Sequence, residues 1–165
     1  MSNVQAICGT KNGENVSFDF TTELRTHENA SANGADPTAG NDIVVGIRAM
    51  FGGNVTGVTG SDSTAWTADH EDDTNQAYFY RISDIASGVT SFTVACTAAG
   101  TEVFVWVWED DETLAPGNVT AWSDSGEGSS SLTHDWSYTT DNSTDTVVGF
   151  CHPGGNRQYS APPGS

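Results

Sequence analysis

The chain has 165 residues, a length that suits one domain with a substantial hydrophobic core. It carries 22 acidic residues against five basic ones, so its formal charge of −17 repels phosphate backbones and anionic lipid and excludes nucleic acid and membranes as direct partners. Polar β- and turn-forming residues are abundant, and uninterrupted stretches of helix formers are nearly absent. We therefore expect an all-β chain folded as an antiparallel β-sandwich, Ig-like or jelly-roll, with about ten strands and little helix.

Strands are predicted where β-branched and aromatic residues lie between turn residues. In chain order they are expected at 3–8, 15–21, 42–51, 54–59, 76–83, 89–97, 102–109, 118–122, 132–139 and 145–151. The links Gly52-Gly53 and Ala99-Gly100 resemble tight hairpin turns, which predicts that 42–59 and 89–109 are each an antiparallel pair. Helix is expected as a turn or two at most, near 22–30.

The pattern predicts one domain over 1–165. Residues 23–41 are polar and predict a long surface loop, and the tail 156–165 resembles a linker. A weak internal repeat aligns 42–54 with 145–156, since both segments read Asp-x-Val-Val-Gly-apolar before Gly-Gly-Asn. The repeat suggests equivalent strands in two related halves.

The first residues contain neither a basic region nor an apolar stretch of the kind that forms a signal peptide, so we expect synthesis and folding in a cytoplasm. Three cysteines, Cys8, Cys96 and Cys151, lie in strand-like contexts and are odd in number. This favours buried free thiols, and the alternative is one disulfide with one remaining thiol.

The segment 102–109 alternates valine with aromatic residues, so both faces of this strand are apolar. The valines fit a packed core. The aromatic row Phe104, Trp106 and Trp108 then needs a second layer, a partner subunit or a ligand. Together with Trp122, this row is the candidate binding site, either a protein interface or a platform for sugar rings. Other aromatic residues would extend the platform or pack in the core: Trp66, Trp136, Tyr78, Phe79 and Tyr80.

Two acidic runs, 70–73 and 109–112, are either solvated loops or calcium sites. The candidate calcium ligands are Asp72, Asp73, Asp110 and Asp111. No other cofactor is expected.

Signals of catalysis are weak. No Gly-x-Ser-x-Gly elbow is present, Cys151 and His152 are mere sequence neighbours, and the four histidines lack zinc spacing. A hydrolase that uses a pair of carboxylates is the minor alternative to a protein without enzymatic activity.

From Gly40 onward the order of features is familiar: Gly-Asn-Asp-Ile-Val-Val-Gly-Ile at 40–47, a glycine link, Val-Thr-Gly-Val-Thr at 55–59, Ala-Tyr-Phe-Tyr-Arg-Ile at 77–82 and then the aromatic strand. This order resembles the Ig-like or jelly-roll modules of bacteriophage structural proteins and of bacterial surface proteins, over about 70 residues. The resemblance carries no binding residues with it. It implies a non-enzymatic virion protein of the capsid decoration (cement) type.

Such a protein would be made in the host cytoplasm, bind the particle exterior and contact a capsid or other virion protein, as a homo-oligomer or within a larger assembly. One departure is that many decoration proteins are anchored by an N-terminal arm, whereas residues 1–20 here read as ordinary strands. The alternative is a carbohydrate-binding or adhesin-like module at an extracellular surface, which would bind glycan through exposed tryptophans.

Overall fold

A computed structural model describes residues 3–26, 31–74 and 76–111. This part of the chain is all-β and forms two antiparallel sheets, which confirms the predicted sandwich. The strands are β1 (Asn3–Asn12), β2 (Asn15–Asp19), β3 (Arg25–Thr26), β4 (Asp42–Met50), β5 (Val55–Gly60), β6 (Thr67–Asp72), β7 (Ala77–Ile82), β8 (Ser91–Cys96) and β9 (Glu102–Asp110). The described ranges contain no helix long and apolar enough to cross a membrane.

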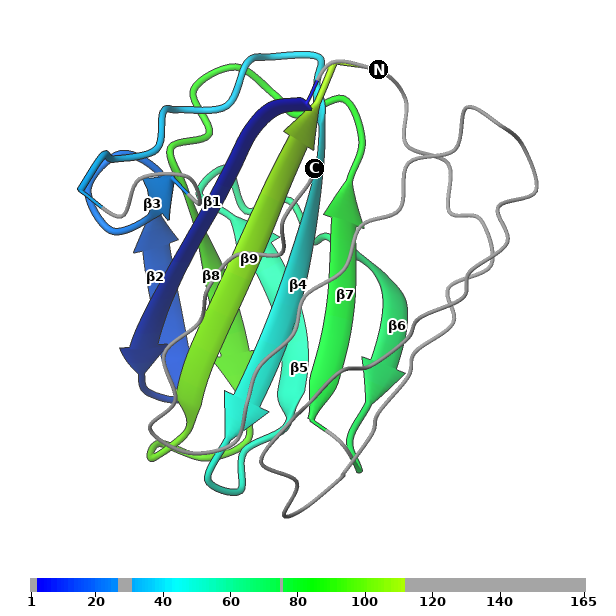
Figure 1. Cartoon of the computed structure of the whole chain (residues 1–165). Coiled ribbons are helices and arrows are strands. Elements are labelled where there is room, and N and C mark those ends of the chain that lie inside the picture. Colours follow the sequence, from blue (N-terminus) through cyan, green and yellow to red (C-terminus); the bar gives the residue numbers. More distant parts are fainter. Residues whose placement is uncertain (1–2, 27–30, 75, 112–165) are drawn as a thin grey trace, which may run out of the picture.

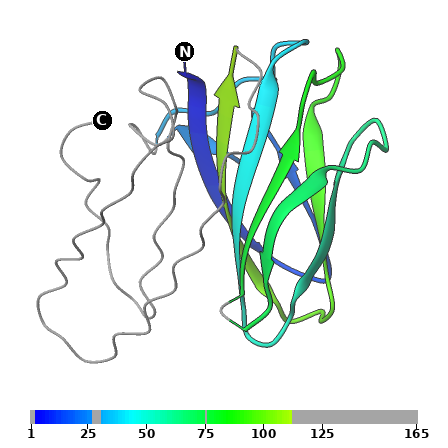
Figure 2. The ribbon, with the colours of Figure 1, turned by 90° about the vertical axis from the view of Figure 1, so that its right-hand side faces the viewer.

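The larger sheet has six strands in the order β3-β1-β9-β4-β7-β6, and the smaller has three in the order β2-β8-β5 (Figure 1). The two sheets face one another, and Figure 2 shows them edge-on as separate layers. Strand β9 lies in the middle of the larger sheet, between β1 and β4, so its neighbours come from the first third of the chain.

The strand pairing is nested about the β5–β6 connection. β1 pairs with β9, β2 with β8, and β4 with β7. β5 is bridged to the chain that leads into β6, through Thr59 and Ala65 and a 2.9 Å hydrogen bond from the Trp66 amide to the Val58 carbonyl. Nested pairs of this kind describe one long hairpin rolled into two layers, so the strand order supports the jelly roll among the sandwich types considered.

The two predicted hairpins are wrong. β4 and β5 lie in different sheets, and so do β8 and β9, because the chain crosses between the layers at each of the two links. At the first link Phe51 and Gly52 have φ values of 64° and 91°, a left-handed pair that turns the chain out of the larger sheet. A glycine-rich link indicates a change of direction, but it does not indicate which sheet receives the next strand.

Two strands were not predicted. β3 is a two-residue addition to the edge of the larger sheet, and β6 contains the acidic run that was expected to be a loop. Its sequence Thr-Ala-Asp-His-Glu-Asp has one β-former, Thr67, but charged residues are common on edge strands because they discourage further strand pairing. The helical turn near 22–30 is not found in its described part, and the predicted strands at 118–122, 132–139 and 145–151 lie outside the described residues.

The core lies between the two sheets. Val103, Val105 and Val107 of β9 contribute to it, as the alternation in that strand predicts. An aromatic cluster forms around Phe92 of β8, whose ring lies 5.5 Å from the rings of Phe18 and Phe20 and 5.2 Å from that of Trp66. Burial of such rings contributes about 1.5–3 kcal/mol each to the free energy of unfolding.

Candidate functional site

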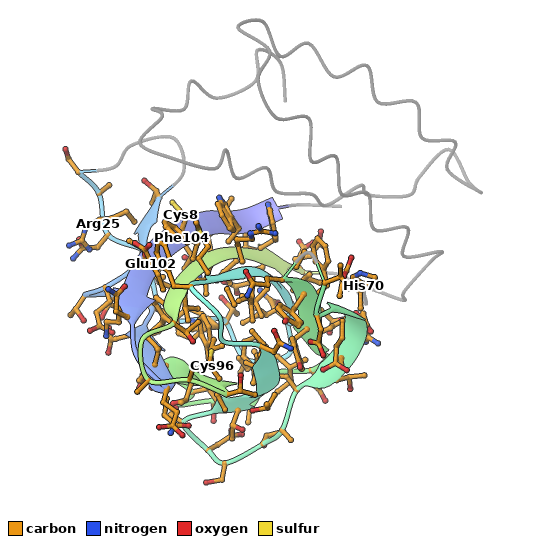
Figure 3. All side chains as sticks on the ribbon, turned by 90° about the horizontal axis from the view of Figure 1, so that it is seen from below. Cys8, Arg25, His70, Cys96, Glu102 and Phe104 are labelled. Atoms are coloured by element: carbon orange, nitrogen blue, oxygen red, sulfur yellow. The ribbon has the colours of Figure 1, made fainter. Side chains whose placement is uncertain are left out.

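The aromatic row of β9 points away from the core. Along this strand the valines are buried, while Phe104, Trp106 and Trp108 between them are partly exposed. Successive side chains of a strand point to opposite faces, so the three aromatic rings lie on the side of the larger sheet that faces away from the smaller one. We call this side the outer face. Figure 3 shows the separation, with Cys96 in the smaller sheet and Phe104 with Cys8 at the larger one.

Residues paired directly across antiparallel strands share a face, so the register defines the rest of the outer face. Trp106 lies opposite Cys8 on one side and Gly46 on the other, and Gly46 in turn lies opposite Phe79. Three rows cross the sheet from β1 to β6: Ala6–Trp108–Val44–Arg81–Thr67, Cys8–Trp106–Gly46–Phe79–His70, and Thr10–Phe104–Arg48–Ala77–Asp72.

The centre of the outer face carries aromatic rings. The rings of Phe104 and Trp106 have centroids 6.4 Å apart and planes inclined by 23°, a stacked arrangement. Gly46, which is buried, carries no side chain and lies between Trp106 and Phe79 in the register. The aromatic row therefore belongs to a wider surface that includes Val44, Phe79 and the thiol-bearing Cys8.

Three of the five basic residues in the chain lie in register with outer-face residues: Arg25 opposite Cys8, Arg48 opposite Phe104 and Arg81 opposite Val44. Arg81 forms an ion pair with Asp69, at 3.0 Å between Nε and Oδ2. Arg48 differs, because its Nε is buried and has no hydrogen-bond partner among the described residues. These arginines share the outer face with acidic residues of the same register, among them Asp72 and Glu102.

His70 contributes a second buried polar atom at the β6 edge of the outer face. Its Nε2 has no hydrogen-bond partner in the described part of the chain. The sequence did not single out Arg48, His70 or Val44 as members of this site, because only the strand pairing brings them beside the aromatic row, whereas Phe79 was a candidate for the platform and lies on this face.

The acidic run 70–73 accepts hydrogen bonds from two tyrosines. Tyr78 and Tyr80 are buried in the core, so they are not part of an aromatic platform, whereas Phe79 between them lies on the outer face. The hydroxyl of Tyr78 donates a 3.0 Å hydrogen bond to Asp73, and that of Tyr80 donates one to Glu71. Burial, and then the hydrogen bond to the carboxylate, raise the pKa of each tyrosine above its usual value.

The four candidate calcium ligands do not come together. Asp72 accepts a hydrogen bond from the Thr74 amide and Asp73 accepts one from Tyr78, at the end of the sheet where β9 begins. Asp110 is the last residue of β9, about 20 Å further along that strand. Within the described ranges, no group of three or more histidine, cysteine or acidic residues could hold a metal ion.

The second acidic run is partly inside the protein. Glu109 and Asp110 are buried, whereas Asp111 is exposed, so the expectation of a solvated run holds only beyond the end of the strand. Asp110 lies opposite Asp42, which is also buried and accepts a 2.9 Å hydrogen bond from the Asp84 amide. Glu109 points toward the core side and takes part in a separate hydrogen-bond network.

The remaining candidates divide between the core and the part of the chain that is not described. Trp66 is buried against Phe92 and is not available to a ligand. Trp122, Trp136 and Cys151 lie outside the described residues. Cys8 and Cys96 are free thiols, as the odd number of cysteines favoured; Cys96 is buried in the core, and Cys8 is only half-buried on the outer face.

Comparison with known proteins adds no relative. No protein-family profile matches the chain, and neither the curated proteins nor the solved structures contain a significant match.

Proposed function

We propose that this protein is a non-enzymatic structural protein of a bacteriophage particle, of the capsid decoration type, and that it attaches to another virion protein through the outer face of its larger sheet. The observation that carries the proposal is the aromatic row Phe104, Trp106 and Trp108, which points away from the core. Tryptophan, phenylalanine and arginine are enriched at the centres of protein interfaces, where they supply most of the binding energy.

The charge distribution supports the same proposal. A net charge of −17 keeps the surface hydrated and discourages non-specific association, whereas the outer face carries the aromatic row and three of the five basic residues. A partner would therefore be directed to one side of the molecule. Jelly rolls occur in viral capsid domains and in lectins, so the fold is compatible with a virion role but does not specify it.

This function can be tested on virus particles purified from a culture that produces the protein. The methods are mass spectrometry and immunogold electron microscopy. We expect the protein on the outside of the particles in a fixed ratio to the major capsid protein. Its absence from purified particles would overturn the proposal.

Rebinding to particles stripped of the protein tests the face. Trp106→Ala is expected to weaken rebinding about 30-fold or more, because a central interface tryptophan typically contributes at least 2 kcal/mol. The control is Thr93→Ala on β8, whose side chain lies on the outer side of the smaller sheet. If both variants rebind like the wild type, the outer face is not the attachment surface.

A carbohydrate-binding function is the second candidate, and the near-parallel rings of Phe104 and Trp106 favour it. Aromatic faces of this kind bind the apolar faces of sugar rings. Titration with a panel of polysaccharides would then change the tryptophan fluorescence of the wild type and change it less in Trp106→Ala. A flat response across the panel would remove this candidate.

A further inference from the structure

The outer face carries two buried nitrogen atoms for which the described residues provide no hydrogen-bond partner. These are Nε of Arg48, beside Phe104, and Nε2 of His70, beside Phe79. The arginine nitrogen is always a donor, and a buried donor left without a hydrogen bond costs about 1–3 kcal/mol. A cover for this face therefore has to supply polar acceptors as well as apolar side chains.

We propose that the cover is the chain's own C-terminal segment, residues 112–165. This segment begins immediately beyond β9, the strand that carries the aromatic row. Its 54 residues span about 180 Å when extended, and β9 is about 30 Å long, so the segment is long enough to pass over the outer face several times.

The composition of the segment complements the outer face. It has six acidic residues and one basic residue, so it offers carboxylates to Arg48 and to the ring nitrogen of His70. It also has five aromatic residues that would pack on the apolar centre: Trp122, Trp136, Tyr138, Phe150 and Tyr159.

A tethered segment also has an advantage over the other occupants. Two copies that dock through this face would bring together two chains of charge −17, whereas the segment is already attached and does not lose the translational and rotational entropy of a separate molecule. The inference stands on the isolated protein and does not need the virion. Where the proposed function also holds, the segment competes with the capsid partner for the same surface and regulates attachment.

The test uses the full chain with the recognition site of a specific protease inserted between Pro116 and Gly117. After cleavage we expect the C-terminal piece to remain bound to the body of the protein in size-exclusion chromatography. Trp106→Ala and, separately, Arg48→Met should each raise the dissociation constant of the piece at least tenfold. Thr93→Ala, on the opposite side of the molecule, should leave it unchanged.

Arg48→Met keeps an unbranched apolar side chain and removes the guanidinium group, so it guards against misreading an unfolded Trp106→Ala variant. Circular dichroism before separation shows that each body is folded. The inference is overturned if the wild-type piece separates on cleavage, or if all three variants retain it equally. It is also overturned if the uncut chain has the mass of a dimer by light scattering and the piece bridges two copies. None of these outcomes depends on virus particles, so they leave the proposed function to its own test.

Discussion

The side-chain amide of Asn41 donates a 2.6 Å hydrogen bond to the carboxylate of Glu109, a residue that is almost completely buried near the end of β9. The same carboxylate accepts hydrogen bonds from the Thr38 amide at 2.8 Å and from the Gln5 side chain at 2.6 Å. Gln5 is held in turn by the backbone of Ala35, to which it donates and from which it accepts. One carboxylate thus fastens the segment that precedes β4 to the end of the larger sheet.

Glu109→Gln should lower the free energy of unfolding by about 1–3 kcal/mol, because the new amide group presents N–H donors where the protein already supplies donors. Gln5 cannot compensate by rotating its amide without losing both hydrogen bonds to Ala35. Urea denaturation measures the change. Glu14→Gln is the matched control, since it removes the same charge from an exposed position. Equal stability of the two variants would show that the network contributes nothing.

Gly53→Ala should destabilise the protein by about 2–3 kcal/mol through overpacking. A Cβ at this position would lie 1.6 Å from Oγ1 of Thr101, a buried residue at the link between β8 and β9. Thr101 also accepts a 2.9 Å hydrogen bond from the Gly13 amide, so the clash would disturb three links at one end of the sandwich.

Thermal unfolding measures this loss, and Gly100→Ala is its control because a Cβ there meets no atom within 4 Å. The control should change stability by less than about 0.5 kcal/mol. A Gly53→Ala variant as stable as the control would contradict the close packing at this link.

The sequence predicted the two faces of β9 because its period is local: every second residue is a valine, and the residues between are aromatic. It did not predict which residues surround the aromatic row, because Cys8, Phe79 and His70 reach Trp106 only through pairing between strands far apart in the chain. The hairpin predictions at the two glycine links were wrong for the same reason. A turn reverses the direction of the chain, but long-range packing decides which sheet the next strand joins.

Acidic residues were the other source of error. Glu109 reads as part of a charged run in the sequence, yet its carboxylate is buried because Gln5, Thr38 and Asn41 supply donors from distant segments. The acidic run 70–73 was not predicted to contain a strand. Its carboxylates accept hydrogen bonds from tyrosine hydroxyls that belong to the neighbouring strand β7. In both cases the carboxylate's hydrogen-bond partners come from other segments of the chain, so a local sequence pattern does not reveal them.

The free energy of unfolding should fall as the pH rises above 9. Burial raises the pKa of the Cys96 thiol from 9.0 to about 11, so the folded protein holds this proton more tightly than the unfolded chain does. The thiol's contribution is fully present below pH 9 and is lost as the pH approaches 11. Urea denaturation between pH 8 and pH 10 should show the decline, and Cys96→Ala should show a smaller slope over the same range. An identical slope in the variant would assign the decline to other groups.

The two tyrosine hydroxyls of β7 should control how firmly the edge strand β6 is held. Tyr78→Phe and Tyr80→Phe remove the hydrogen bonds to Asp73 and Glu71 without changing the shape of the core, so each should cost about 1 kcal/mol. Hydrogen exchange should accelerate in β6 more than in the central strands, since an edge strand opens locally when its fastenings are lost.

Thr59→Val is the control for this pair, because it removes an exposed hydroxyl from β5 in the smaller sheet. It should leave exchange in β6 unchanged. If the tyrosine variants also leave that exchange unchanged, backbone pairing alone holds β6. If they accelerate it, the acidic run has a structural role in positioning His70 at the margin of the outer face, and weakening that run is expected to loosen the site as well as the strand.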